Sequence, residues 1–226
     1  MGASSRTLIV GDVHGCIEEL NALLAEASFR AGEDRLIFIG DLIGKGPHSR
    51  AVYERARELK ADAILGNHEW RLLESVEGGK PAGKAVRRLR EEFGDGFDAL
   101  IEDLKQWPFW IDSDAFLAVH GGLIPGRGPA ISRPVDLVNI RTWDGTGDDL
   151  QDPKNPPWFE FYHDVRPVVF GHWAVLGGVV RENVIGLDTG CVYGGELSLV
   201  IFPGRKIVSV PAKKAYCTIK VQDSRG

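Results

Sequence analysis

Three short apolar runs in the first third of the chain are each followed by a polar or glycine-containing turn and then by residues with helical spacing. These runs are TLIV (7–10), RLIFI (35–39) and DAILG (62–66). The first helical stretch, about 17–27, places Leu20, Leu23 and Leu24 on one face, and the second covers about 49–60. Strand patterns that alternate with helical patterns in this way predict a β-α-β-α-β unit with parallel strands.

The rest of the chain continues the α/β pattern. Residues around 77–110 are charged, have helical periodicity and show no strand pattern, so we expect a helical insertion there. Strand patterns then resume at 115–122, 167–173, 183–188, 196–202 and 206–210. A chain of 226 residues is long enough to bury one compact core. We therefore expect residues 1–226 to form a single domain.

The overall charge and the cysteines restrict the partners and the compartment. The net charge of −5 provides no general attraction to nucleic acid or to an anionic membrane. Three cysteines without a Cys-x-x-Cys pair suit a reducing compartment better than a disulfide framework. No apolar run approaches the roughly 18 residues of a membrane span. These features predict a cytoplasmic protein that has no membrane partner and makes only local contacts with nucleotides.

Polar side chains of the kinds that bind metals follow the predicted strands, at the carboxyl ends where ligands gather in a parallel sheet. Any one of these short motifs is more often a structural turn than a site. Together they favour a site, because four of the six histidines follow an apolar run or a strand end. The residues are Asp12 and His14 in GDVHG, Asp41 in GDLIGKG, Asn67 and His68 in GNHE, His120 in VHGG and His172 in FGHW.

This mixture of imidazole, carboxylate and amide oxygen donors suits manganese, iron, cobalt or zinc, whereas oxygen donors alone would favour magnesium or calcium. The donors are too many for one ion. Two ions about 3.5–4 Å apart that share a carboxylate would use them all. Such a pair hydrolyses phosphate esters by in-line attack, so the donors predict a phosphohydrolase.

The motifs GDVHG, GDLIGKG, GNHE, HGG and GH, in that order, resemble the calcineurin-like metallophosphoesterases, specifically the phosphoprotein-phosphatase branch. The resemblance covers about residues 11–195. It implies an α/β fold with a β-sandwich flanked by helices, and two divalent ions. Manganese is the first expectation, with iron, cobalt, zinc or nickel as alternatives. The family pattern implies these ligands: Asp12 and His14 for one ion, Asp41 as the bridge, and Asn67, His120 and His172 for the other.

The resemblance also implies which residues carry out catalysis. A hydroxide held between the two ions would attack phosphorus, and Asp41 would hold both ions. His68 would act as the general acid that protonates the leaving oxygen.

The stretch GDLIGKG (40–46) discriminates within this family. It is not a phosphate-binding loop of the Walker type, because no serine or threonine follows its lysine. Protein phosphatases carry an aspartate and an arginine where this chain has Gly44 and Lys45. The symmetrical diadenosine-tetraphosphate hydrolases also lack that aspartate, and LDTGCVYGG (187–195) resembles their late motif. Glu69, the last residue of GNHE, differs from these hydrolases, because many of them have aspartate at that position.

Lys45 and Arg141 are the cations expected to bind substrate phosphate. Lys45 stands where the family has arginine, and a point charge holds phosphate less firmly than a bidentate guanidinium. Family members place an arginine between HGG and GH, which favours Arg141, although an ordinary surface arginine fits the pattern too. Asn67 and Tyr193 are also predicted to bind the substrate phosphates. For Tyr193, packing against neighbouring side chains is the alternative. A basic run could steer polyphosphate or form a solvated helix face: Lys80, Lys84, Arg87, Arg88 and Arg90.

These observations predict a dinuclear-metal-dependent hydrolase that cleaves the phosphoanhydride bonds of dinucleoside polyphosphates, converting diadenosine tetraphosphate to two ADP. Nucleotide-capped RNA 5′ ends are additional expected substrates. The alternative is a serine/threonine or dual-specificity phosphatase that acts on phosphoproteins, which GNHE and the shared metal centre motivate. A non-catalytic binding module is a third hypothesis, disfavoured by the complete set of ligands and acid.

Overall fold

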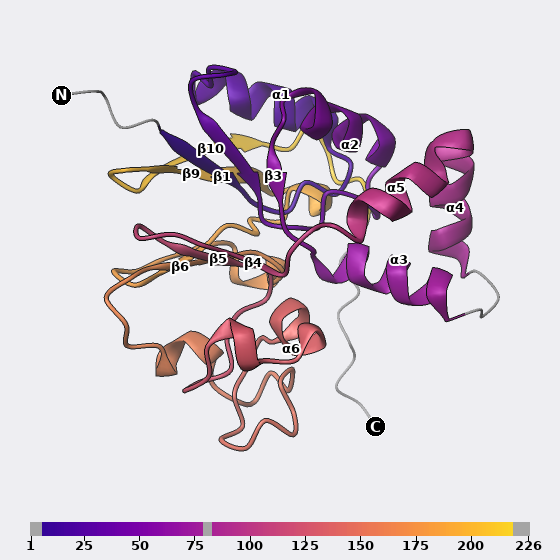
Figure 1. Ribbon diagram of the computed structural model, residues 1–226. Helices are drawn as coiled ribbons and strands as arrows, with labels where there is room; N and C mark the ends of the chain where they lie inside the picture. The colour runs from indigo at the N-terminus through magenta and orange to yellow at the C-terminus, as the bar shows by residue number, and fades with distance from the viewer. Residues whose placement is uncertain (1–5, 79–82, 219–226) are drawn as a thin grey trace.

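The computed structural model describes residues 6–78 and 83–218, and two five-stranded sheets form its centre (Figure 1). The first sheet has the strand order β10-β9-β1-β2-β3. Its bounds are β1 Thr7–Val10, β2 Arg35–Phe38, β3 Asp62–Ala63, β9 Glu196–Phe202 and β10 Lys206–Pro211. β1, β2 and β3 are parallel, which confirms the predicted β-α-β-α-β unit. β9 and β10 form the antiparallel hairpin at the other edge.

The second sheet has the strand order β4-β5-β6-β8-β7. Its bounds are β4 Trp110–Asp112, β5 Leu117–Val119, β6 Val168–Phe170, β7 Val179–Val180 and β8 Val184–Gly186. The three central strands are parallel, and the two edge strands are antiparallel to their neighbours. The carboxyl ends of β5 and β6 therefore lie on the same edge of this sheet.

Strand β1 shows how the two sheets are held together. Ile9 packs between the sheets in a core that also contains Val169 of β6 and Val200 of β9. Leu8 and Val10 point the other way, into the core beneath the helices. Because both faces of β1 are buried, the strand is continuously apolar, as is usual for parallel strands. A third core covers the outer face of the second sheet, around Trp158 and other aromatic side chains.

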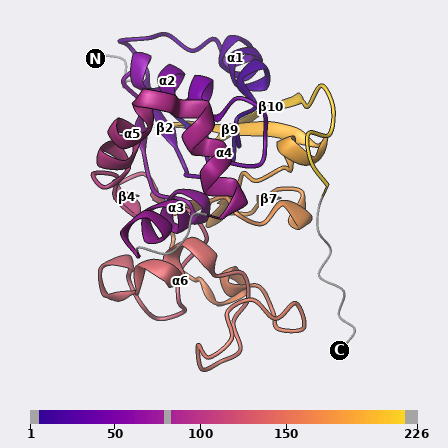
Figure 2. The same ribbon diagram turned by 90° about the vertical axis from the view of Figure 1, so that its right-hand side faces the viewer.

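The helices cover the sheets and extend one end of the molecule. Their bounds are α1 Ile17–Glu26, α2 Ser49–Glu58, α3 Asn67–Glu77, α4 Lys84–Phe93, α5 Phe97–Leu104 and α6 Pro134–Asn139. α1 and α2 cover the first sheet, and α6 lies beyond the second (Figure 1). α3, α4 and α5 gather at one end, which faces the viewer in Figure 2. Among the described residues, no helix is long and apolar enough to cross a membrane.

The helical insertion predicted at 77–110 is present with narrower bounds. α4 and α5 occupy most of 84–104, but Trp110 already begins strand β4, which the sequence pattern did not reveal. Residues 79–82 of the predicted segment lie outside the described residues. β3 is shorter than the run DAILG because the N–H of Leu65 leaves the ladder and donates to the carbonyl of Pro108 at 2.9 Å.

Candidate metal centre and substrate site

The loops that follow β1, β2, β5 and β6 are held together in pairs by backbone hydrogen bonds. The N–H of His14 donates to the carbonyl of Asp41 at 2.8 Å, which ties the first loop to the second. In the other sheet, the N–H of Gly171 donates to the carbonyl of His120 at 2.8 Å. His14, Asp41 and His172 adopt left-handed backbone, with φ of 47°, 51° and 69°. Residues other than glycine avoid this region, and strain of this kind is typical of functional loops.

Asp12, His14 and Asp41 lie together and are buried. Nε2 of His14 is 3.4 Å from a carboxylate oxygen of Asp41 and 4.0 Å from one of Asp12. Nδ1 of His14 is 3.2 Å from the carbonyl of Ile43, which can only accept, so Nδ1 carries the ring proton. Nε2, the ring nitrogen near the two carboxylates, is therefore left with a lone pair, as metal-binding histidines are commonly arranged.

Asn67, His120 and His172 form a second group that adjoins the first. Nε2 of His120 and Nδ1 of His172 lie 3.1 Å and 2.9 Å from Oδ1 of Asn67. Nε2 of His120 is also 3.5 Å from a carboxylate oxygen of Asp41. The other ring nitrogen of each histidine lies 2.8 Å or 3.1 Å from a backbone carbonyl and so carries the proton. Asp41 consequently borders both groups.

The chemistry of these donors fits divalent cations. Among the described residues, three clusters have potential ligand atoms within 4.8 Å of one another, and Cys16, Glu19 and Cys191 form one of them. The other two are His14, Asp41 and His68, and Asp12, Asp41 and His120. Asp41 belongs to both, as a carboxylate shared between two ions would. Burial raises the pKa of Asp12 well above its ordinary value, and the Asp188 and Asp41 carboxylates add to this. Two buried carboxylates this close stay ionised together only if positive charge lies between them.

Glu69 holds the second loop, a role that sequence reasoning did not assign. Its buried carboxylate accepts the N–H groups of Asp41 at 2.8 Å, Gly66 at 3.1 Å and Ile43 at 3.1 Å. Burial raises the pKa of Glu69 to about 8, and the Asp41 carboxylate contributes in the same direction. Glu69 thus positions the backbone of Asp41 against the start of α3. A glutamate three residues after the helix-capping Gly66 was the available signal.

His68 is the second residue of α3, and its ring packs against Gly44. A Cβ atom at Gly44 would lie 2.5 Å from Nδ1 of His68, and Gly44 has φ of +91°. The rings of His68 and His14 meet edge-on with centroids 4.8 Å apart. Burial lowers the pKa of His68 to about 4, although the Asp41 carboxylate opposes the shift. This arrangement leaves no room for an aspartate side chain at position 44.

Lys45, Tyr193 and Arg141 surround the two groups of donors. Nζ of Lys45 lies 2.8 Å from Nε2 of His14 and 5.3 Å from the centre of the Tyr193 ring. Arg141 is half-buried, and its Nε has no hydrogen-bond partner in the part of the chain that the structure describes. Burial lowers the pKa of Arg141, while the carboxylates of Asp188 and Asp41 oppose this. A buried guanidinium N–H without a partner among the described residues is a donor left unsatisfied, which is unusual in a folded protein.

Arg71 adds a cation that sequence reasoning missed. It lies on α3, three residues after His68 and therefore on the same side of the helix. Its Nη2 is 3.4 Å from Oδ1 of Asn139. The charge of Arg71 acts to lower the pKa of both His68 and Arg141, which places it near the predicted acid and the predicted phosphate ligand. The helical spacing from His68 was the signal.

The basic run on α4 does not act as one surface. Arg88 donates to the carbonyls of Lys45 at 3.2 Å and Gly46 at 2.7 Å, so it fastens α4 to the loop that carries Lys45. Lys84 is exposed and lines a cavity beside His68. Lys80 lies outside the described residues.

Comparison with known proteins places these features in context. The family model described as calcineurin-like phosphoesterase matches residues 5–183. The chain is 32% identical to the symmetrical bis(5'-nucleosyl)-tetraphosphatase of Vibrio cholerae, over 92% of this chain and 98% of the relative. The crystal structure of a protein assigned as a diadenosine tetraphosphatase has a TM-score of 0.80 at 32% identity, covering 93% of this chain and 95% of that one.

A protein phosphatase structure is also similar, at a greater distance. The cold-active protein-tyrosine phosphatase of a psychrophilic Shewanella species has a TM-score of 0.55 at 17% identity, covering 92% of this chain and 80% of that one. A likeness at this identity shows a shared fold alone.

Proposed function

Because this chain belongs to the calcineurin-like phosphoesterase family, we propose that it cleaves dinucleoside polyphosphates, converting diadenosine tetraphosphate to two ADP. The family confirms the resemblance found in the motifs and makes the chain a metal-dependent phosphohydrolase. The relative from Vibrio cholerae, named as a symmetrical tetraphosphatase, supports the substrate class.

The observation that carries the substrate assignment is the contact between Gly44 and His68. A side chain at Gly44 would have its Cβ 2.5 Å from Nδ1 of His68, so no carboxylate can orient the ring from that position. In the reaction, water adds to one phosphorus, the bond to the bridging oxygen breaks, and its electron pair leaves with the nucleoside diphosphate. That group leaves far more readily than a serine alkoxide, so a less strictly held acid is sufficient.

The roles proposed for the site residues follow from their positions. Asp12, His14 and Asp41 would hold one ion, and Asn67, His120 and His172 would complete a site for the second with Asp41 shared. When bound, divalent ions supply an activated water molecule and neutralise charge on the phosphoryl oxygens. Manganese is our first choice, and iron, cobalt, zinc or nickel suit the same nitrogen and oxygen donors.

The remaining side chains would bind the substrate and move a proton. His68 would donate a proton to the departing oxygen, a step worth about 10²–10⁴-fold. Lys45 and Arg141 would bind phosphoryl oxygens, with Asn67 and Tyr193 beside them. Arg141 is half-buried and its buried Nε has no hydrogen-bond partner among the described residues, which supports its part in this role.

The phosphoprotein alternative is not favoured. Protein phosphatases resemble this chain in fold at 17% identity, whereas the tetraphosphatase relative reaches 32%. RNA 5′ ends capped with nucleoside tetraphosphates stay a proposed second substrate, since they carry the same anhydride chain. A cytoplasmic location also stays a prediction, which the free state of Cys16, Cys191 and Cys217 supports.

Nucleotide products decide the function. The protein supplied with manganese should convert diadenosine tetraphosphate to ADP as the sole nucleotide, measured by anion-exchange chromatography. Equal amounts of ATP and AMP would contradict symmetrical cleavage. Asp41→Asn should abolish turnover while its circular dichroism spectrum stays unchanged, whereas full activity in that variant would contradict the role of Asp41. A higher kcat/KM for a phosphopeptide than for the dinucleotide would favour the protein phosphatase alternative.

A further inference from the structure

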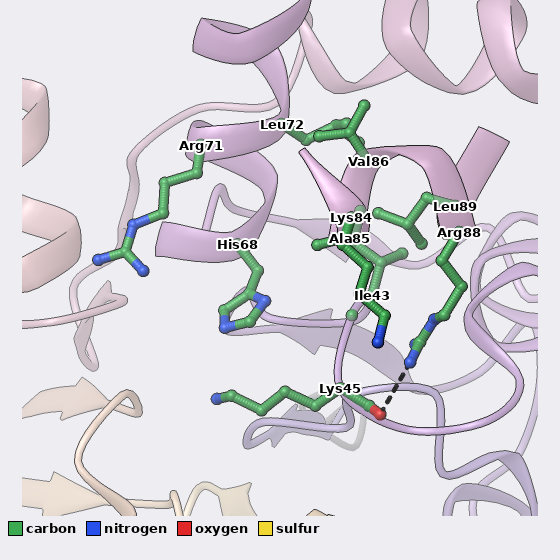
Figure 3. A pocket seen from close by; sticks show the side chains of 11 residues that line it. Ile43, Lys45, His68, Arg71, Leu72, Lys84, Ala85, Val86, Arg88 and Leu89 are labelled. Atoms are coloured by element: carbon green, nitrogen blue, oxygen red, sulfur yellow. Dashed lines mark hydrogen bonds between the residues drawn. The ribbon is translucent and has the colours of Figure 1, made fainter. Parts of the chain in front are cut away.

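A cavity of about 460 Å³ opens between α3 and α4, directly beside His68 (Figure 3). Its apolar lining comes from Ile43, Leu72, Val86 and Leu89. Volumes of this size are typical of small-molecule sites, in which apolar walls surround a few polar groups. A second cavity of about 350 Å³ lies near Trp158, and neither His68 nor any proposed metal ligand lines it.

The charges around the cavity are of one sign. None of the eleven residues that line it is acidic, and Lys45, Arg71, Lys84 and Arg88 contribute cations. Arg88 is engaged with the loop carbonyls, but Lys84 is exposed at the rim. In Figure 3 the head groups of Arg71 and Lys45 lie on one side of His68, and Leu89 and Lys84 lie on the other. An anionic chain followed by a flat apolar group matches this order of contacts.

The position of the acid connects the cavity to the reaction. A general acid must reach within hydrogen-bond distance of the oxygen that departs. The leaving group therefore extends away from phosphorus past His68, and the space beside His68 on the α4 side is this cavity. A nucleoside attached to the departing phosphates would enter it.

We infer that the cavity between α3 and α4 binds the nucleoside of the departing nucleoside diphosphate. The apolar walls accept the base, Arg71 beside His68 attracts the departing phosphates, and Lys84 contributes a cation at the rim on the nucleoside side of the cavity. This inference rests on the proposed function, because it assigns the leaving half of that substrate. Because α4 belongs to the helical insertion and lines the cavity, the insertion would help to determine which substrates bind.

A large side chain introduced at the exposed rim of the cavity tests this inference. Ala85 lines the cavity and is exposed, so Ala85→Trp fills the space without disturbing the core. Glu91→Trp is the matched control, because Glu91 is exposed on the same helix and does not line the cavity. The measured quantity is the ratio of kcat/KM for diadenosine tetraphosphate to kcat/KM for inorganic tetraphosphate, whose departing pyrophosphate carries no nucleoside and does not need the cavity.

Ala85→Trp should lower this ratio about tenfold or more, as expected when a well-fitting pocket is obstructed, and Glu91→Trp should not. Lys84→Glu, at a second exposed position, should weaken ADP binding in calorimetry by about tenfold or more through charge reversal. An unchanged ratio in Ala85→Trp together with unchanged ADP affinity in both cavity variants would overturn the inference. The products of the wild-type protein separate a failure of this inference from a failure of the proposed function. If the wild-type protein makes ADP and the cavity variants behave like it, the inference is wrong and the proposed function stands.

Discussion

Gly44 occupies a position where the backbone and the acid leave room for no other residue. Its φ of +91° lies in the region that side chains avoid, and its Cα faces Nδ1 of His68. The neighbouring Lys45 also has a positive φ, of 39°. The loop therefore combines backbone strain with a close approach to His68, as is common where a fold holds reacting groups.

Gly44→Ala should displace the His68 ring and lower kcat by about 10²–10⁴-fold, the contribution of a general acid. Gly145→Ala is the matched control, because Gly145 has φ of +90° and no neighbouring atom within 4 Å of an added Cβ. The control should lose about 1–2 kcal/mol of unfolding free energy from strain and keep its kcat. Steady-state assays measure kcat for both variants, and urea unfolding checks that each variant is folded. Equal kcat values would show that the close approach of position 44 to His68 does not contribute to catalysis.

The side chain of Arg88 links helix α4 to the loop that carries Lys45. Arg88 reaches the carbonyls of Lys45 and Gly46, and hydrogen bonds from a charged donor typically contribute about 1.5–3 kcal/mol. Arg88→Leu should therefore loosen the 40–46 loop and raise KM for the dinucleotide. Hydrogen exchange should show faster exchange at the amides of this loop, with the amides of β1 as an internal reference. Unchanged exchange in the loop would mean that α4 does not hold it.

Elements that lie within a distinct apolar run could be predicted from the sequence, and strands without such a run could not. The strands β1 and β9 have the predicted bounds, since their residues are apolar over the whole run. β7 has two residues flanked by glycines and charged residues, and β4 lies at the end of the segment with helical periodicity, so neither stood out as a strand. β5, β6 and β8 have three residues each but lie within the apolar runs predicted as strands. In the site, the motif residues at strand ends come together as expected. Arg71 and Glu69 were missed because each depends on which side of α3 faces the loops.

At the scale of the whole molecule, two packed sheets bring their loops to one place. Ile9 of the first sheet and Val169 of the second share the central core, which fixes Asp12 and Asp41 against His120 and His172. Carboxylates from the first sheet thus meet histidines from the second. Because both sheets contribute to this binding site, a bound cation should raise the free energy of unfolding. At cation concentrations above the dissociation constant, this gain should grow with the logarithm of the cation concentration.

The number of bound ions tests the central claim most directly. The chelated protein, reloaded with manganese and freed of excess metal by gel filtration, should carry two manganese ions per chain by inductively coupled plasma mass spectrometry. Asp41→Asn, which removes a charge from the carboxylate proposed to be shared, should carry fewer than two. A wild-type protein that binds no ion, or never more than one at saturating manganese, would contradict the account.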